Sequence, residues 1–334
     1  MSSRARLGGF GAPLRSVTRA RSGRGAGRLG DRVLFGLCAL AGVIVAVTLG
    51  DIVYQLISNA KPAISKFGLG FLGHQTWAPN FNRFGAATMI YGTAVSSAFA
   101  LLMATPLGIA IALYLSMIAG PRVRAVVGPL VEMLAAVPSI IMGFWGIFVL
   151  LPFLQKLEPG LHSVLGFIPL FGPSQTTGRS VFAAGIVLTL MILPIISSLS
   201  RDLFLTVPQE LKDGAAALGA TRWEIIRGVV LPSTLSGVTA ATILALGRAL
   251  GEAIAVSLVI GNVSAIHASL FEPGTTLAER IATQFPSANT GLYIGALFYA
   301  GLVLLVIGLI TSLAARAISG RFDVERSYAR AAAG

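Results

Sequence analysis

Charged residues are scarce in this chain of 334 residues, because Asp, Glu, Lys and Arg together make up only 11% of it. Soluble domains usually carry about 25% charged residues. With 55% hydrophobic residues and a mean hydropathy of +0.82, the composition excludes an ordinary soluble protein and predicts several membrane-spanning stretches. Cysteine is nearly absent, and the single Cys38 excludes an internal disulfide.

Two other absences limit the chemistry of the chain. The sequence contains no Gly-x-x-x-x-Gly-Lys-Ser/Thr motif, so it lacks the loop that cradles nucleotide phosphates. Its three histidines, His74, His162 and His267, fall in separate predicted loops without metal-ligand spacing. We therefore expect no catalytic residue, no cofactor and no metal on this chain.

The net charge of +12 is concentrated at the N-terminus. Eight arginines precede the first apolar stretch: Arg4, Arg6, Arg15, Arg19, Arg21, Arg24, Arg28 and Arg32. With many Gly and Ser residues and one acid, residues 1–32 are predicted to be a disordered cytoplasmic tail. A flank attracted to anionic membrane lipid is favoured over a nucleic-acid-binding arm.

Six apolar stretches predict six membrane-spanning helices. They are Val33–Ile57, Ala86–Met117, Ala125–Leu154, Ser180–Leu199, Leu235–Ile260 and Leu292–Ala315. With the N-terminal tail in the cytoplasm, 18 of the 25 Lys and Arg residues lie on the inner side and six on the outer side, and Arg248 is the remaining one. This asymmetry predicts that both termini are cytoplasmic. The membrane domain is expected over residues 33–317, followed by a C-terminal cytoplasmic tail, 318–334.

Arg248 and Glu252 lie near the middle of the predicted fifth span, and each directly follows a glycine, Gly247 and Gly251. A charge at that depth costs at least a few kcal/mol. Residues four apart share one face of a helix, so the two side chains are expected to pair. A structural pair joining two helices is one interpretation; a site on a solute path is favoured, because charges within the membrane usually mark such paths.

Glu132 lies near the inner end of the predicted third span, ahead of Pro138-Ser139. Prolines inside spans are typical of broken helices around a cavity. Glu132 is therefore a candidate for lining the path, together with Ser139, or for pairing with an arginine of a partner chain. A structural role at the Pro138-Ser139 break is an equal alternative.

The loop over residues 201–232 is predicted to be a helix, a glycine turn and a second helix. Thr206 to Gln209 and Thr221 to Glu224 both have capping-box spacing. Gly219 stands where a helix C-terminal glycine is expected, and Leu231-Pro232 is expected to end the second helix. Three alanines before the glycine suit either close docking of the backbone into a partner or simply helix formation.

This loop resembles the cytoplasmic coupling loop of permease subunits of ABC importers. Asp213, Gly214 and Ala215 stand at the Glu-Ala-Ala position of that family. Gly219 follows at the family's spacing, and Val229–Pro232 matches its Ile-x-Leu-Pro ending. The departures are Asp for Glu, Gly for the first Ala and Val for Ile. The coupling residues implied by the resemblance are Asp213, Gly214, Ala215, Gly219, Thr221, Glu224, Leu231 and Pro232.

Further stretches resemble the phosphate-specific (Pst-type) permeases, and within them the PstC-like subunit. These are Glu132–Ser139, Gly143–Gly146, Gly247–Glu252, Ser269–Gly274 and Ile281–Phe285. The resemblance implies an all-α membrane protein of the type I ABC importer kind, in the bacterial plasma membrane. It also implies a PstA-like sister permease, a PstB-like ATPase dimer that binds ATP and Mg²⁺, and a PstS-like extracytoplasmic phosphate-binding protein.

The function expected from this resemblance is that of a permease subunit, not an enzyme, which forms half of the path of an ATP-driven phosphate importer. Arg248 would hold phosphate oxygens through its fork of N–H donors. Glu252 would accept a hydrogen bond from a protonated phosphate and would neutralise Arg248 when the path is empty. An ABC permease for sulfate or molybdate, an ion-coupled secondary transporter, and a phosphate-sensing scaffold are the alternatives.

Overall fold

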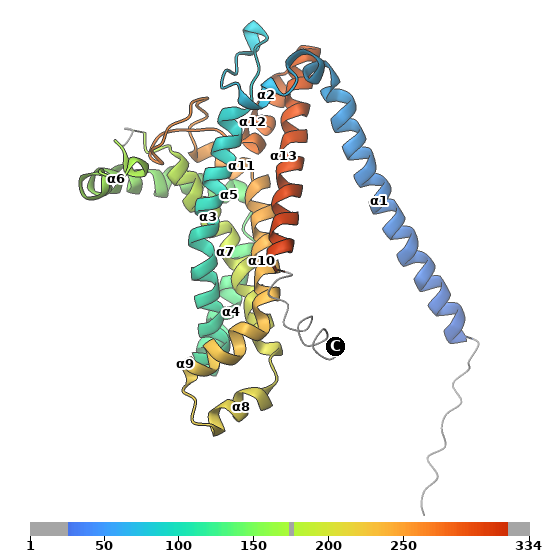
Figure 1. Cartoon of the computed structure of the whole chain (residues 1–334), viewed down its shortest axis with the longest axis vertical. Coiled ribbons are helices and arrows are strands. Elements are labelled where there is room, and N and C mark those ends of the chain that lie inside the picture. Colours follow the sequence, from blue (N-terminus) through green and yellow to red (C-terminus); the bar gives the residue numbers. More distant parts are fainter. Residues whose placement is uncertain (1–25, 174–176, 320–334) are drawn as a thin grey trace, which may run out of the picture. The chain divides into compact units, whose positions relative to one another are not determined.

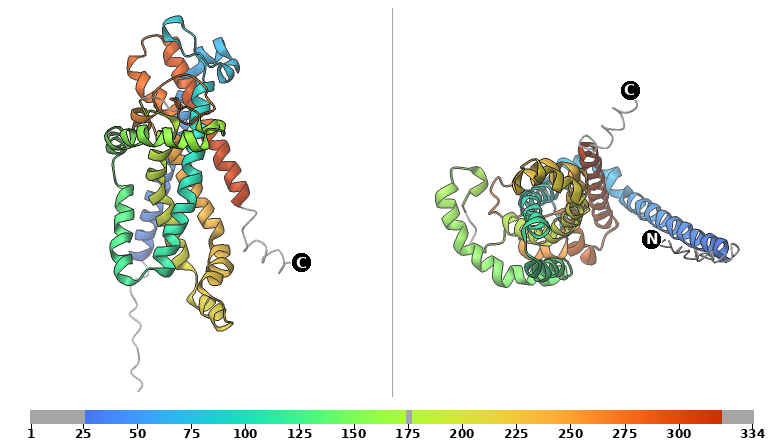
Figure 2. Two further views of the ribbon diagram at one scale, coloured as in Figure 1. Left: turned by 90° about the vertical axis from the view of Figure 1, so that its left-hand side faces the viewer. Right: turned by 90° about the horizontal axis from the view of Figure 1, so that it is seen from below.

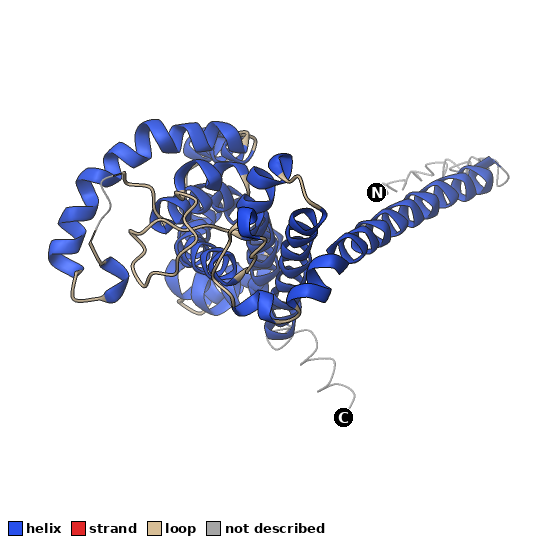
Figure 3. Cartoon of the chain, turned by 90° about the horizontal axis from the view of Figure 1, so that it is seen from above, coloured by secondary structure: helices blue, strands red, loops and turns tan. Residues whose placement is uncertain are grey.

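Helices form all the regular secondary structure in residues 26–173 and 177–319, which are the residues that this computed structural model describes (Figure 1, Figure 3). The α-helices are α1 Ala26–Phe67, α2 Gly70–Gly73, α3 Ala87–Leu113, α4 Pro121–Ala135, α5 Ser139–Trp145, α6 Leu151–Leu165, α7 Val181–Thr206, α8 Gln209–Ala217, α9 Arg222–Ile225, α10 Leu231–Gly251, α11 Ile254–Val259, α12 Leu277–Gln284 and α13 Gly291–Ser319. The all-α fold predicted from the sequence is confirmed.

Six helices or helix runs are long and apolar enough to cross a membrane. They are Gly30–Phe67, Ala87–Ile118, Ser139–Leu165, Val181–Thr206, Arg222–Gly251 and Gly291–Ala317. The number agrees with the sequence prediction, although several boundaries differ. The chain divides into two units, residues 1–54 and 55–334, and α1 crosses the boundary between them. Because α1 begins at Ala26, the end of the predicted disordered tail is helical; residues 1–25 and 320–334 lie outside the described residues.

The predicted third span, Ala125–Leu154, is two helices rather than one. Helix α4 ends at Ala135, and Pro138 precedes α5 with an extended ψ of 138°. A residue before proline is disfavoured in the helical region, which explains why the first helix stops here. The run that follows continues to Leu165, so the loop predicted to start at Gln155 is half helical. Figure 2 and Figure 1 show α6 lying across the direction of α3 and α7.

Leu231-Pro232 does not end a helix, in contrast to the prediction. The residues before it, Ile226–Val230, form a π turn, and the Leu231 N–H donates to the carbonyl of Ile226, five residues earlier. Proline has no N–H to donate, and the wider turn accommodates this loss without breaking the helix. The same arrangement precedes Pro152, where the Leu151 N–H donates to Gly146. Helical structure therefore continues from Arg222 to Gly251.

Helix α7 is the centre of the main core. It is the most buried of the long helices, and it packs against α3, α4 and α10. Glycines allow close approach at two of these contacts. A Cβ on Gly108 of α3 would lie 2.9 Å from Ile196, and one on Gly237 of α10 would lie 2.7 Å from Leu203. These contacts hold α3 and α10 directly against α7.

A second core closes the end of the bundle formed by α2, α12 and the start of α13. Its aromatic rings stack: Phe71 on Tyr299 with centroids 4.3 Å apart, and Phe84 on Tyr293 at 5.4 Å. A third, smaller core around Phe204 and Val230 lies at the other end, beside α8 and α9. The bundle thus has a separate packed core at each end (Figure 1).

Candidate functional site

Arg248 is exposed on α10, beside the face that packs into the core. The neighbouring face carries Ala241, Ala245 and Ala249, which are four residues apart and buried. Arg248 is exposed, as are Gly247 and Gly251 beside it, and a Cβ on either glycine would meet nothing within 4 Å. The guanidinium makes no hydrogen bond or ion pair within the described residues. An arginine held near the end of a spanning helix without an internal partner is available to a ligand or to another chain.

The predicted helical pair of Arg248 and Glu252 is wrong in its geometry. Helix α10 ends at Gly251, and Glu252 is extended, with φ −73° and ψ 119°. Its carboxylate turns toward α11, where Oε1 accepts a hydrogen bond from the Ala255 N–H at 3.3 Å. Gly247 and Gly251 weaken the helix near its end, and Glu252 lies beyond that end. The four-residue spacing therefore does not put the two side chains on one helix face. Glu252 stabilises the start of α11 instead.

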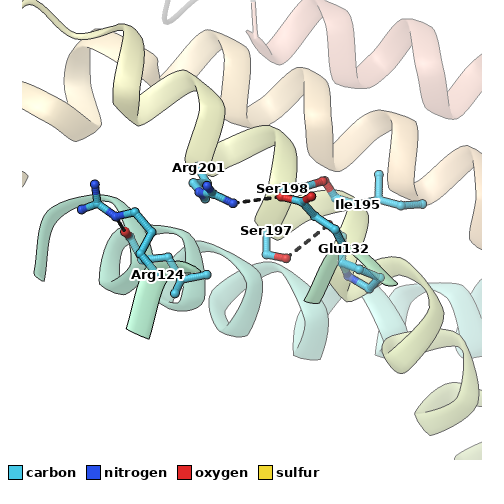
Figure 4. Close-up of polar contacts among 8 residues, drawn as sticks. Arg124, Glu132, Ile195, Ser197, Ser198 and Arg201 are labelled. Carbon is cyan, nitrogen blue, oxygen red and sulfur yellow. Dashed lines mark hydrogen bonds and ion pairs between the residues drawn. The ribbon is translucent and has the colours of Figure 1, made fainter. Parts of the chain in front are cut away.

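Glu132 pairs with an arginine of its own chain, Arg201. Arg201 Nη1 donates to Glu132 Oε1 at 2.9 Å, and this is the one ion pair found within the described residues (Figure 4). The pair joins α4 to α7. The Arg201 side chain is 20% exposed and that of Glu132 is 56% exposed, so the carboxylate still faces solvent on one side.

The pocket that holds Arg201 is shaped by small residues. A Cβ on Gly128 would lie 3.0 Å from Nη1, so glycine makes room for the guanidinium. The Nε of Arg201 and the hydroxyl of Ser200 are buried without a hydrogen-bond partner in the described residues. Ser139, the other predicted residue of this region, begins α5 and is half-buried, apart from this pair.

We expect the Glu132–Arg201 pair to stabilise the packing of α4 on α7. In a double-mutant cycle with Glu132→Gln and Arg201→Gln, the coupling should be about 1 kcal/mol, above the usual value for exposed pairs because Arg201 is mostly buried. Thermal unfolding of the purified protein measures it. Unchanged stability in Glu132→Gln together with reduced uptake would instead place Glu132 on the path.

The segment between α7 and α10, residues 207–230, contains one of the two predicted capping boxes. Thr221 Oγ1 accepts from the Glu224 N–H, and the Glu224 carboxylate accepts from the Thr221 N–H at 2.7 Å. Thr206, by contrast, is the last residue of α7, and its hydroxyl donates to the Leu203 carbonyl. Because α7 extends seven residues beyond the predicted Leu199, no residue is left free to cap α8 at this position.

Gly219 adopts the left-handed conformation expected for a helix C-terminal glycine, with φ +88°. It follows α8, whose Asp213 carboxylate accepts from Gln209 at 2.9 Å. The surface around the turn is open: Leu218 is 91% exposed and Trp223 is 63% exposed. Two large apolar side chains held in water beside a tight turn indicate a surface that a partner covers.

A recess of about 860 Å³ lies between α8 and the ends of α3 and α7. Basic side chains line it on several sides, namely Arg124, Lys212 and Arg222. Arg124 is fixed in place, since its Nε and Nη2 donate to the Leu115 and Ser116 carbonyls (Figure 4). Helix α8 is mostly exposed, and its Ala215 packs against the third core.

The first turn of α12 contains a buried charged cluster that sequence reasoning missed. Glu279 is fully buried and accepts from the hydroxyls of Thr275 and Thr283, and Arg280 is 5% exposed and donates to Ser264 at 2.9 Å. Burial lowers the pKa of the Arg280 guanidinium. The Leu277 N–H donates to Thr93 of α3, which connects the start of α12 to the bundle. The signal in the sequence was the adjacent pair of opposite charges, Glu279 and Arg280, between the predicted fifth and sixth spans.

Comparison with known proteins places this arrangement in a family. Residues 104–324 match the family described as binding-protein-dependent transport system inner membrane component. The phosphate transport system permease protein PstC of Mesorhizobium japonicum is 42% identical over 301 residues, which cover 88% of this chain and 91% of that protein. The protein PstC 2 of Mycobacterium tuberculosis is 38% identical, covering 88% and 93%.

Solved structures agree on the fold. A bacterial alginate ABC transporter, crystallised in complex with an alginate pentasaccharide-bound periplasmic protein, contains a chain with a TM-score of 0.60. It is 16% identical in sequence, and the match covers 88% of this chain and 98% of that one. At that identity the likeness concerns the fold of an ABC importer permease alone.

Proposed function

The chain belongs to the family of binding-protein-dependent transport system inner membrane components, and within it to the PstC permeases; on that premise we propose that it is the transmembrane permease subunit of an ATP-driven importer of inorganic phosphate. It would form half of the translocation path. The structural observation that supports a phosphate path is Arg248, which is exposed on a spanning helix and has no partner among the described residues.

The proposed role of Arg248 follows from its chemistry. A guanidinium presents fixed N–H donors that match the oxygens of a phosphate, and bonds between charged groups are about twice as strong as neutral ones. Glu252, capping α11, would hold the break in the helix open beside Arg248 and present its second oxygen to a protonated phosphate. Sulfate carries no such proton near neutral pH. Glu132 and Ser139 would line the path nearer its inner end.

We infer the partner subunits from the family and from the exposed face of α10. A permease of this family works with ATPase and binding-protein subunits. The specific partners that we propose are a PstA-like sister permease, a PstB-like ATPase dimer carrying ATP and Mg²⁺, and a PstS-like phosphate-binding protein. The sister permease would cover the exposed face of α10, since half a path needs a second half. Hydrolysis of ATP would occur on the separate ATPase, so this chain is a transport subunit.

Energy from the ATPase would reach this chain through the inner loop. The proposed docking element comprises α8, the turn at Gly219 and the capped start of α9, with the exposed Leu218 and Trp223 at its rim. Thr221 and Glu224 fix the turn, and Leu231-Pro232 continues it into α10. The residues matching the Glu-Ala-Ala motif, Asp213, Gly214 and Ala215, lie within α8.

The test of the proposed function is uptake. Cells lacking the chain should lose high-affinity uptake of labelled phosphate and regain it when the chain is restored, while uptake of labelled sulfate and molybdate should not change. A defect in sulfate or molybdate uptake would favour a permease for another oxyanion. Phosphate transport that continues without an ATPase subunit would favour an ion-coupled transporter.

We further propose that both termini are cytoplasmic, from the asymmetry of the basic residues. Single cysteines placed near Trp77, His162 and His267, in a chain with Cys38→Ser, should react with a membrane-impermeant reagent in intact cells. Cysteines at Ala220 and Arg326 should react only after permeabilisation. The reverse pattern would overturn the orientation.

A further inference from the structure

The turn over residues 77–84, here called the outer turn, is closed by its own backbone. The Ala78 N–H donates to the Arg83 carbonyl at 2.8 Å, and the Arg83 N–H donates back at 3.2 Å. Asn82 completes the turn in the left-handed conformation, with φ +50°. Figure 1 shows this segment at the end of the bundle opposite α8. The tip is thus preorganised and does not depend on a partner for its shape.

Both legs of the outer turn are anchored in the aromatic core at this end. The Trp77 and Phe84 rings lie 4.9 Å apart, and Phe84 stacks on Tyr293. Trp77 Nε1 donates to Gln284 Oε1 at 2.6 Å, and the Tyr293 hydroxyl donates to the same oxygen at 2.7 Å. The turn is therefore rigidly connected to α12 and α13.

Phe81 stands at the tip of this rigid turn with 77% of its surface exposed. Its neighbours Asn80, Asn82 and Arg83 are exposed as well. At the base of the tip lies a recess of about 470 Å³ lined by amide and hydroxyl groups, from Asn80, Asn82, Ser287, Asn289 and Thr290, and no charged residue lines it. An exposed aromatic ring beside an uncharged polar recess combines the two elements of a protein interface, an anchor and adaptable hydrogen bonds.

We propose that the outer turn is a docking surface for the extracytoplasmic phosphate-binding protein, with Phe81 inserted into an apolar socket of that protein and the recess receiving polar main-chain or side-chain groups beside it. This inference rests on the proposed function, which supplies the partner. Membrane insertion fits the surface less well, because one phenyl ring flanked by asparagines offers neither an apolar face nor a row of Trp, Tyr and Lys residues. A rigid anchor loses little conformational freedom on binding, which favours affinity.

The first test measures affinity with the assembled transporter in lipid nanodiscs and the purified, phosphate-loaded binding protein. We expect Phe81→Ala to raise the dissociation constant about tenfold or more, as truncation of an anchor residue does. Phe81→Tyr should change it by less than about threefold, because it keeps the ring. The matched control is Phe167→Ala, since Phe167 is 81% exposed on another loop; it should leave the constant unchanged.

The second test identifies what contacts the tip. A photoreactive benzoylphenylalanine at position 81 should cross-link to the binding protein when that protein is present and loaded. Adducts with lipid or with the sister permease alone, or an unchanged constant in Phe81→Ala, would overturn the docking surface while phosphate transport by the unmutated complex remains intact. If the unmutated complex binds no phosphate-binding protein, the partnership itself fails, and the docking surface fails with it.

Discussion

Replacing Arg248 with glutamine should abolish phosphate uptake while the protein still inserts and assembles. Hydrogen bonds to charged groups are worth about 1.5–3 kcal/mol each, so the loss of a two-pronged contact predicts a fall of at least about a hundredfold in uptake. The chain's own packing should be unaffected, because Arg248 is exposed and bonds to no described residue. Uptake of labelled phosphate at matched protein abundance measures the effect.

The variants around Arg248→Gln separate charge from geometry. Arg248→Lys keeps the charge but not the planar fork, and we expect an intermediate rate. Arg316→Gln removes an exposed arginine from the last turn of α13 and is the matched control, with uptake near normal. If Arg248→Gln transports phosphate at close to the normal rate with normal abundance, Arg248 is not on the solute path.

Replacing Gly219 with valine should uncouple transport from ATP hydrolysis. The left-handed backbone at φ +88° penalises a β-branched residue by about 1–2 kcal/mol. A Cβ at this position meets nothing within 4 Å of it, so the folded chain itself has room for the side chain. The added bulk therefore acts on whatever covers the turn. We expect loss of the ATPase subunits on copurification, or loss of hydrolysis stimulated by the loaded binding protein.

Gly219→Asn is the matched variant for this position. Asparagine tolerates the left-handed conformation, so it adds a side chain without most of the backbone strain. A mild defect in Gly219→Asn with a severe one in Gly219→Val would assign the effect to the backbone of the turn, and equal severe defects would assign it to steric exclusion of the partner. Full phosphate transport by the Gly219→Val complex would show that this turn is not the coupling element.

The sequence sufficed for the number of spanning helices, because long apolar runs are visible in the sequence without knowledge of the packing. It also sufficed for Gly219 and the cap from Thr221 to Glu224, whose geometry is local. These features need only a residue and its near neighbours to be specified.

The sequence did not suffice where the backbone departs from an ideal helix. The break after Gly251 separates Glu252 from Arg248, and the π turn before Pro232 lets a helix continue where proline was expected to end it. The contact of Glu132 with Arg201 joins residues far apart in the chain, which spacing rules do not reach. Glycines and the missing proline N–H account for the first two, tertiary packing decides the third, and each lies in the candidate site.

The continuous helical run from Arg222 to Gly251 connects the loop around Gly219 to the region of Arg248. It spans 30 residues, and at about 1.5 Å per residue it is about 45 Å long, so a tilt of about 10° at one end carries the other through about 8 Å. Its inner end is the capped turn, and Arg248 lies one turn from its other end. Gly237 of this run packs closely against Leu203 of α7, so the two helices are in direct contact. A rotation of this helix that begins at the loop around Gly219 would therefore displace Arg248 by several ångströms, so one continuous helix connects the proposed docking element to the candidate site.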